Sequence, residues 1–464
     1  MRRLNKWARA LIWVLALILC MVGVTLFFYL RHSRATDRLL EAERIRMQAI
    51  QGINREITGD YDPALAVTCD NGTFVGQAQN GVLACKGIPY AAPPVDELRW
   101  QPPVDAEPGD GVYEALYFGK SCIQTEAYTE RASLYAQGED CLTLNVWSST
   151  SDTSGKAVMV FFHGGSFGWG GTADPIYDGQ RFVEAHGDVV LVTANYRVGM
   201  LGFMDFTEVP GGEAYAKSGN LGLLDQISAL RWVQRNIAQF GGDPDNVTIF
   251  GQSGGGGKVN AMLTTPAAEG LFHKGILMSG VGGRRPPMPK TSKKPLVEAL
   301  LKALGETEVS ALETVPFEKL REAYRAVAPT LQQQGIMGWW APTPNDWYLG
   351  DPYEVGFLDW AKDIPVMVGS VIAEWGFGPA PAGKNTMDAA EKRTLLAKQF
   401  GEEKVDALIS AFRAAFPEKN ELDLLSLSNR LGTMEYCAYH AENARAKTFN
   451  YLFAYTFTYD GGKP

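Results

Sequence analysis

The sequence predicts an α/β fold with a mostly parallel central sheet covered by helices on both faces. Short apolar runs rich in β-branched residues occur at 158–162, 189–194 and 247–250. A segment with helical periodicity, 221–240, lies between the second and the third run. Continuous apolar strands that alternate with helices are typical of parallel strands buried on both faces.

Turn and helix signals complete this arrangement. Two Asn-Gly pairs, at 71–72 and 80–81, interrupt short β-like runs and predict β-hairpins. Residues 287–334 are charged and helix-prone, and we interpret them as an insertion or cap. Residues 395–445 are also helix-prone, and they lead into a predicted strand at 449–459.

Composition excludes some classes of function. The 464-residue chain has 43 Lys and Arg against 52 Asp and Glu, a net charge of -9. Nucleic-acid binding needs a basic surface, so we expect no nucleic-acid partner. No H-E-x-x-H or similar ligand spacing occurs, and we expect neither a metal site nor a cofactor. The sequence does not indicate an oligomeric state.

The N-terminus predicts a membrane segment. Four basic residues within the first nine precede an uncharged stretch at 10–30, which is long enough to span a bilayer as a helix. Because basic flanks favour the cytoplasmic side, we expect an anchor at 1–34, a helical linker at 35–60 and an extracytoplasmic domain at 61–464. Residues 33–35 also fit a signal cleavage site, in which case the protein would be secreted.

Residues 251–255 read GQSGG and match the G-x-S-x-G pattern of a nucleophile elbow. They follow the apolar run at 247–250 and open a helix. A sharp turn between a strand and a helix exposes the serine hydroxyl above the sheet edge. The helix N-terminus also places N–H groups near developing negative charge. This context predicts Ser253 as the nucleophile of an α/β-hydrolase fold.

A second glycine-rich segment, residues 163–167 (HGGSF), directly follows the run at 158–162. Glycine N–H groups can bind the oxyanion of a tetrahedral intermediate. We expect the N–H groups of Gly164, Gly165 and Gly254 to form this oxyanion hole. His163 is interpreted as an orienting residue of the loop and not as the catalytic base.

Further motifs occur in the order of one known family over residues 66–460. They are GIPYAAPP (87–94), LRW (98–100), EDCLTLNVW (139–147), NYR (195–197), GNLGL (219–223), DQ (225–226) and FGGDP (240–244). With the two glycine-rich segments, they resemble the type-B carboxylesterase/lipase family, which includes the cholinesterases. The resemblance implies an α/β-hydrolase fold and a serine carboxylesterase that forms an acyl-enzyme with small-molecule esters.

The resemblance also implies a catalytic glutamate after the strand that follows the nucleophile half of the fold. The predicted strand at 364–368 leads to Glu374, which we expect to orient a histidine and stabilise its imidazolium. Cys122 and Cys141 enclose a short loop, are the best candidate disulfide pair and resemble the first disulfide loop of the family. Whether Cys69 pairs with Cys85 is open on spacing alone.

The histidine of the implied triad is missing from its expected place after the last central strand. We interpret every histidine of the sequence as structural or superficial; they are His32, His163, His186, His273 and His440. We therefore expect the sequence to be a C-terminally truncated fragment whose catalytic histidine lies beyond Pro464. Without a base the serine is hardly nucleophilic, so the fragment is expected to be nearly inactive.

The alternative is a catalytically dead, cholinesterase-like adhesion or binding protein. Such relatives typically lack the serine, whereas Ser253, the 163–167 loop and Glu374 are all present. The family usually has alanine after the serine, where this chain has Gly254. The loop between the paired cysteines lacks the tryptophan that binds choline in cholinesterases, so we expect no choline-ester specialist.

Overall fold

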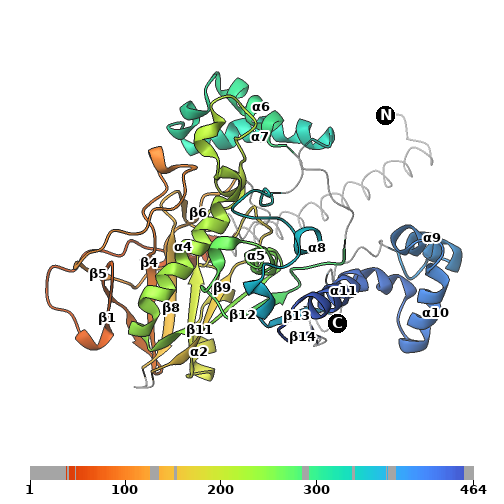
Figure 1. Ribbon diagram of the computed structural model, residues 1–464, viewed down its shortest axis with the longest axis horizontal. Helices are drawn as coiled ribbons and strands as arrows, with labels where there is room; N and C mark the ends of the chain where they lie inside the picture. Colours follow the sequence, from red (N-terminus) through yellow and green to blue (C-terminus); the bar gives the residue numbers. More distant parts are fainter. Residues whose placement is uncertain are drawn as a thin grey trace, which may run out of the picture.

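The structure is a computed structural model that describes residues 38, 41–47, 49–125, 135–150, 154–284, 292–336, 340–371, 374 and 383–453. At its centre lies a nine-stranded sheet with the strand order β14-β13-β12-β11-β9-β10-β8-β4-β3 (Figure 1). The strands are β3 (Gln77–Gln79), β4 (Val82–Pro89), β8 (Thr143–Ser149), β9 (Lys156–Phe162), β10 (Val189–Ala194), β11 (Gly242–Gln252), β12 (Lys274–Met278), β13 (Val366–Val371) and β14 (Thr448–Phe453).

The sheet is parallel from β14 to β10, and β8, β4 and β3 continue it in antiparallel pairing. This confirms the predicted, mostly parallel α/β fold. Strand β10 coincides with its predicted range, whereas the strand expected at 364–368 was placed too early. A short 3₁₀ turn at Trp360–Asp363 has Ile364 as its C-terminal cap, so β13 begins only at Val366.

Both predicted hairpins form. Strands β1 (Ala66–Cys69) and β2 (Gly72–Val75) pair antiparallel, and β3 pairs antiparallel with β4. Asn80 and Gly81, between β3 and β4, have φ angles of 49° and 76°. These left-handed values at both central residues are what a tight hairpin turn requires. Two smaller pairings lie outside the main sheet. Strand β5 (Val112–Glu114) pairs with β2, and β6 (Ser121–Cys122) pairs with β7 (Gln137–Gly138).

Helices cover both faces of the sheet, and β9 shows why. Its residues Val158, Val160 and Phe162 are buried in the main hydrophobic core, which also includes residues of α4 (Leu221–Asn236) and α5 (Gly254–Met262). Met159 of the same strand packs on the opposite side, in a second core that contains Val183 of α2 (Gln180–Ala185). An apolar strand without polar alternation thus has both faces buried, as the sequence pattern predicted.

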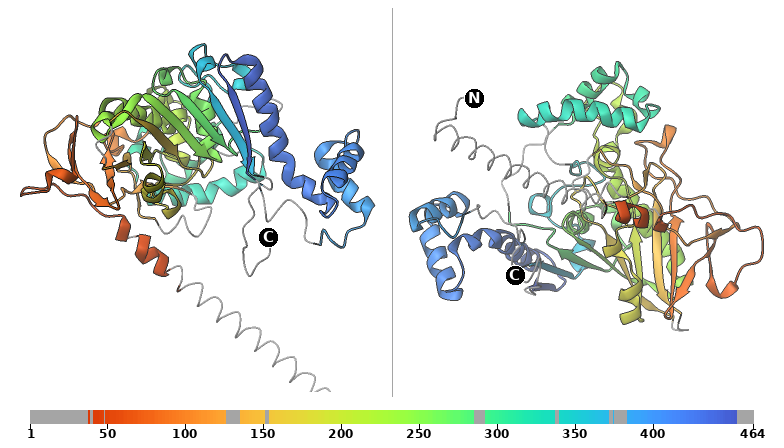
Figure 2. Two further views of the ribbon diagram at one scale, coloured as in Figure 1. Left: turned by 90° about the horizontal axis from the view of Figure 1, so that it is seen from below. Right: turned by 180° about the vertical axis from the view of Figure 1, so that it is seen from behind.

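The remaining helices lie around this sheet. Helices α6 (Lys294–Leu304) and α7 (Phe317–Gln333) pack on each other and contribute to the main core. They lie within the segment 287–334, which the sequence predicted to be helical. Helices α9 (Ala389–Phe400) and α10 (Val405–Ala415) form a separate small core that extends away from the sheet (Figures 1 and 2). Helix α11 (Ser428–Asn443) lies against β13 and β14, and the short helices are α3 (Gly199–Phe203) and α8 (Pro352–Val355).

The expected membrane anchor at 1–34 lies outside the described residues. In the part of the chain that the structure describes, no helix has the length and apolarity to cross a bilayer. Of the expected linker, residues 41–47 are helical, and Met47 is fully buried. Asn54 donates to the carbonyl oxygens of Lys86 and Tyr117. The second half of the linker therefore packs on the domain.

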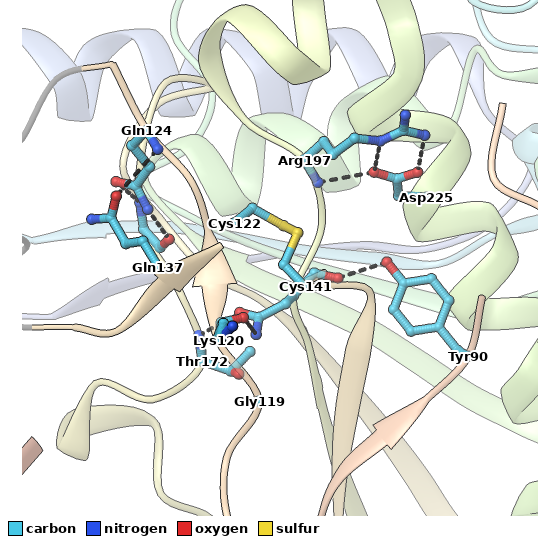
Figure 3. The surroundings of a disulfide bond; sticks show 12 residues. Tyr90, Gly119, Lys120, Cys122, Gln124, Gln137, Cys141, Thr172, Arg197 and Asp225 are labelled. Carbon is cyan, nitrogen blue, oxygen red and sulfur yellow. Dashed lines mark hydrogen bonds and ion pairs between the residues drawn. A yellow bond between two sulfur atoms is a disulfide. The ribbon is translucent and has the colours of Figure 1, made fainter. Parts of the chain in front are cut away.

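The predicted disulfide lies in one buried region with two of the sequence motifs, NYR (195–197) and DQ (225–226). Cys122 and Cys141 are bonded, which confirms the predicted pair (Figure 3). Arg197 and Asp225 form a bidentate ion pair, with 2.7 Å between Nη2 and Oδ1, and both side chains are almost inaccessible. Cys69 and Cys85 are buried free thiols, so the second cysteine pairing is not formed.

Candidate active site

Ser253 lies at the sharp turn between β11 and α5. Its φ and ψ angles are 55° and -124°, a left-handed conformation that is strained for a residue with a side chain. Two backbone hydrogen bonds hold it there: Ser253 N donates to Met278 O at 2.8 Å, and Gly257 N donates to Ser253 O at 3.0 Å. The strained and tightly bonded turn is the local structure that the G-x-S-x-G pattern predicts.

The glycines beside Ser253 are required by close backbone contacts. A Cβ at Gly251 would collide with the backbone of Gly255, and one at Gly255 would collide with the Phe162 carbonyl oxygen. Phe162 is the last residue of β9. The glycines therefore let α5 start directly against the end of the neighbouring strand, which keeps the serine above the sheet edge.

The loop after β9 carries two candidate oxyanion donors and places one of them, Gly164, beside the serine. A Cβ at Gly164 would lie 3.7 Å from the Ser253 Cβ, and Gly165 has a φ of 89° that favours glycine. Within the described residues, neither Gly164 N–H nor Gly165 N–H donates a hydrogen bond. Gly254 is the first residue of α5, where an N–H has no partner inside the helix. Among the described residues, none of these three N–H groups has a hydrogen-bond acceptor, which is what an oxyanion hole requires.

A cavity of about 570 Å³ joins Ser253 to Glu374. Glu374 follows β13 as predicted, and its Oε2 accepts a hydrogen bond of 3.1 Å from Asn429 Nδ2 on α11. The candidate oxyanion donors Gly164, Gly165 and Gly254 do not line this cavity. Its lining is Ser253, Ser279, Gly282, Gly283, Arg284, Glu374, Gln399, Phe400, Asn429, Leu431, Gly432 and Glu435. The structure therefore brings the predicted serine and carboxylate to one opening.

A second cavity, of about 440 Å³, shares Gly282 and Gly283 with the first. Three tyrosines line it, Tyr348, Tyr353 and Tyr436, together with Phe167 of the glycine loop. The two cavities therefore share part of their wall.

None of the four described histidines lines the cavity with Ser253. His163 is buried and stacks on Tyr196, with 4.2 Å between ring centroids. Burial, together with the charge of Lys258, lowers the pKa of His163 to about 3. This ring is therefore neutral and structural, which agrees with its interpretation as an orienting residue.

The other described histidines are also held elsewhere. His273 Nδ1 accepts a hydrogen bond of 3.1 Å from Val247 N, and His440 Nδ1 lies 2.8 Å from Thr448 Oγ1. His186 caps the C-terminus of α2. His32 lies outside the described residues.

The sequence did not predict several residues that lie around Ser253. Asn429 and Glu435 come from α11, and nothing in their local sequence links them to Glu374. For Lys258 the sequence did carry a signal, because a charged residue lies on the predicted helix directly after the nucleophile. The structure shows that this lysine is fully buried. No group of three or more His, Cys, Asp or Glu side chains suited to a metal occurs among the described residues.

Comparison with known sequences points to one family. The carboxylesterase family model matches residues 63–459. The chain is 38% identical to the para-nitrobenzyl esterase of Bacillus subtilis over 352 residues, which cover 73% of this chain and 70% of that protein. It is 34% identical to the fumonisin B1 esterase of Sphingopyxis macrogoltabida, over 80% of this chain and 66% of that protein.

Solved structures agree with this result. An esterase from Clostridium hathewayi, described as able to hydrolyse aliphatic aromatic polyesters, is 40% identical and superposes with a TM-score of 0.74. The similarity covers 89% of this chain and 82% of the other. A carboxylesterase of Geobacillus stearothermophilus is 31% identical, with a TM-score of 0.66 over 85% of this chain and 81% of the other.

Proposed function

The chain belongs to the carboxylesterase family, and we propose that it is a serine carboxylic ester hydrolase that acts through an acyl-enzyme at Ser253. The observation that carries this proposal is the joint placement of Ser253 and Glu374 on one cavity, with unbonded loop N–H groups beside the serine. A serine held in a strained turn with a carboxylate and N–H donors around it is suited to acyl transfer.

In the proposed reaction, Ser253 Oγ attacks the ester carbonyl carbon and loses its proton to a base. The carbonyl oxygen becomes an oxyanion, which the N–H groups of Gly164, Gly165 and Gly254 stabilise. The C–O bond to the alcohol then breaks, and the alcohol leaves with the proton. Water attacks the acyl-enzyme in the same manner and releases the carboxylic acid and free Ser253.

Glu374 is proposed to orient the base and to stabilise its cation. Its hydrogen bond from Asn429 fixes one carboxylate oxygen, Oε2. The other oxygen, Oε1, accepts no hydrogen bond from the described residues, and we propose that it accepts one from an imidazole N–H. The described histidines are bonded or placed elsewhere, so the proposed base is a group outside the described residues. Substrates are proposed to be small-molecule esters, as the family implies.

The test is labelling of the folded, full-length protein with a fluorophosphonate probe, followed by mass spectrometry of the modified peptide. We expect a covalent adduct on Ser253, and we expect hydrolysis of p-nitrophenyl butyrate that Ser253→Ala abolishes. Ser279→Ala is the matched control, because Ser279 lines the same cavity and also has a positive φ. Folded protein without an adduct on Ser253 would contradict the proposal and favour an inactive binding protein.

We also propose that the domain works outside the cytoplasm. Support comes from the Cys122–Cys141 disulfide, because such bonds persist in oxidising compartments. Cell fractionation with a protease-accessibility assay tests this proposal. In cells whose outer membrane has been removed but whose inner membrane is intact, resistance of the domain to added protease would contradict this proposal.

A further inference from the structure

Lys258 is a buried cation on α5, the helix that begins directly after Ser253. Its side chain has no exposed surface, and its Nζ donates a hydrogen bond to the Ser166 carbonyl oxygen. Nζ also lies 4.7 Å from the centroid of the Phe167 ring. The Tyr196 ring centroid is 5.1 Å away. Among the described residues, its partners are a carbonyl group and two ring faces, and burial of a charge with so few partners is costly.

Ser166 is the residue on which this cation acts. It follows Gly164 and Gly165 in the loop after β9, and its φ of 56° is unfavourable for a residue with a side chain. Such a conformation persists only where surrounding contacts enforce it. The hydrogen bond from Lys258 is one of these contacts. A second is the packing of Ser166 on Gly254, where a Cβ would collide with the Ser166 carbonyl oxygen.

We propose that Lys258 is a positioning residue, which holds the Ser166 carbonyl against α5 and thereby fixes the Gly164 and Gly165 N–H groups relative to Ser253. This role rests on the proposed function, because it concerns the oxyanion donors of that reaction. Donors stabilise a transition state most when they are already oriented before charge develops. Lys258 is inaccessible to substrate, so it acts through the loop.

The protonation state of Lys258 offers a direct way to observe this role. Burial lowers the pKa of Lys258 to about 7, so the ammonium group loses its charge as pH rises through that value. The titratable groups that face it are His163, whose pKa it lowers, and Tyr196, whose pKa burial raises. Charge-assisted hydrogen bonds are roughly twice as strong as neutral ones, so the hold on Ser166 weakens above this pH.

The experiment compares Lys258→Met with Lys156→Met in the full-length protein. Lys156 is a matched control, since it is also a buried lysine and donates to the Ser149 carbonyl oxygen at 2.8 Å. It is the first residue of β9, at the opposite end of that strand from His163. We expect Lys258→Met to lower kcat for p-nitrophenyl butyrate about 10- to 100-fold with KM changed less than about twofold. Lys156→Met should leave both constants within about twofold.

A pH series gives a second readout. The ratio of Ser253 labelling rates, wild type over Lys258→Met, cancels the titration of the catalytic base. We expect this ratio to fall as pH rises through about 7. Lys258→Arg keeps a permanent charge, so the corresponding ratio of Lys258→Arg over Lys156→Met should not fall there. This arginine variant carries the test if the methionine variant does not fold.

The outcomes are distinguishable. Without labelling of wild-type Ser253, the proposed function fails, and the role of Lys258 falls with it. With normal wild-type labelling, a Lys258→Met kcat within about twofold of wild type would overturn the positioning role alone. A flat ratio of labelling rates between pH 6 and 9 would also overturn it.

Discussion

Gly254 and Ser166 are in backbone contact, and the contact leaves no room for a side chain at position 254. A Cβ there would collide with the carbonyl oxygen, the Cα and the carbonyl carbon of Ser166. The family usually has alanine at this position. In this chain, therefore, the glycine after the nucleophile matches the conformation of the loop that supplies the candidate oxyanion donors.

We expect Gly254→Ala to displace this loop. The variant should lower the rate of Ser253 labelling at least about 10-fold, and overpacking of this kind costs about 1–3 kcal/mol of unfolding free energy. Gly257→Ala is the control in the same helix, because a Cβ there would lie 3.5 Å from Gly280 O, an ordinary contact. That control should label normally and gain up to about 1 kcal/mol from helix propensity. Equal labelling of both variants would contradict the prediction.

Glu374→Gln tests the proposed role of the carboxylate. The amide preserves size but removes the charge that would stabilise an imidazolium, so kcat should fall about 10²- to 10⁴-fold. Glu435→Gln is the control. Glu435 lines the same cavity, but among the described residues the hydrogen-bond partner of Glu374 is Asn429 and not Glu435. Asn429→Ala removes the hydrogen bond to Oε2 and should give a smaller loss. A loss below about threefold for Glu374→Gln would remove this residue from the mechanism.

Asp225→Ala should strongly destabilise the fold. It leaves the guanidinium of Arg197 buried without its carboxylate, and such a loss typically costs about 3–5 kcal/mol. Urea unfolding followed by tryptophan fluorescence measures this change. The comparison is Arg235→Ala, which breaks partly exposed ion pairs with Asp70 and Asp105 and should cost under about 1 kcal/mol. A smaller loss for Asp225→Ala than for Arg235→Ala would contradict the prediction.

His440 predicts a loss of stability in acid. Burial lowers the pKa of His440 to about 4, below its ordinary value of 6.5, so the folded state favours the neutral ring. Its contribution to stability is complete above pH 6.5 and is lost as pH falls towards 4. His163, whose pKa is lowered to about 3, acts in the same direction.

Thermal unfolding between pH 7.5 and 4 checks this prediction. The melting temperature of wild type should fall more steeply than that of His440→Asn, in which a neutral amide replaces the ring near Thr448. His186→Gln, at the exposed end of α2, should follow wild type. Parallel curves for wild type and His440→Asn would show that this ring does not titrate with unfolding.

Local sequence patterns determined much of the fold. The apolar run at 189–194 is strand β10 without change, and Asn80–Gly81 is a hairpin turn. The first hairpin also forms, although it turns at Asp70 and Asn71 and Gly72 already begins β2. The elbow at Ser253 was also predictable, because its strain, its glycines and the flanking strand and helix lie within a few neighbouring residues. Patterns of this kind depend on short-range geometry, which a sequence carries directly.

Only the tertiary structure decided which distant groups meet. Glu374 and Asn429 are separated by 55 positions, and Lys258 and Ser166 by 92, yet each pair is hydrogen-bonded. Cys122 and Cys141 bond, whereas Cys69 and Cys85, whose pairing the spacing left open, remain thiols. No local pattern encodes such contacts, because they depend on how the sheet order and the loop after β9 bring separate segments together. The sequence determined that Ser253 lies in an elbow; the packing of the loop and of α11 decided what surrounds it.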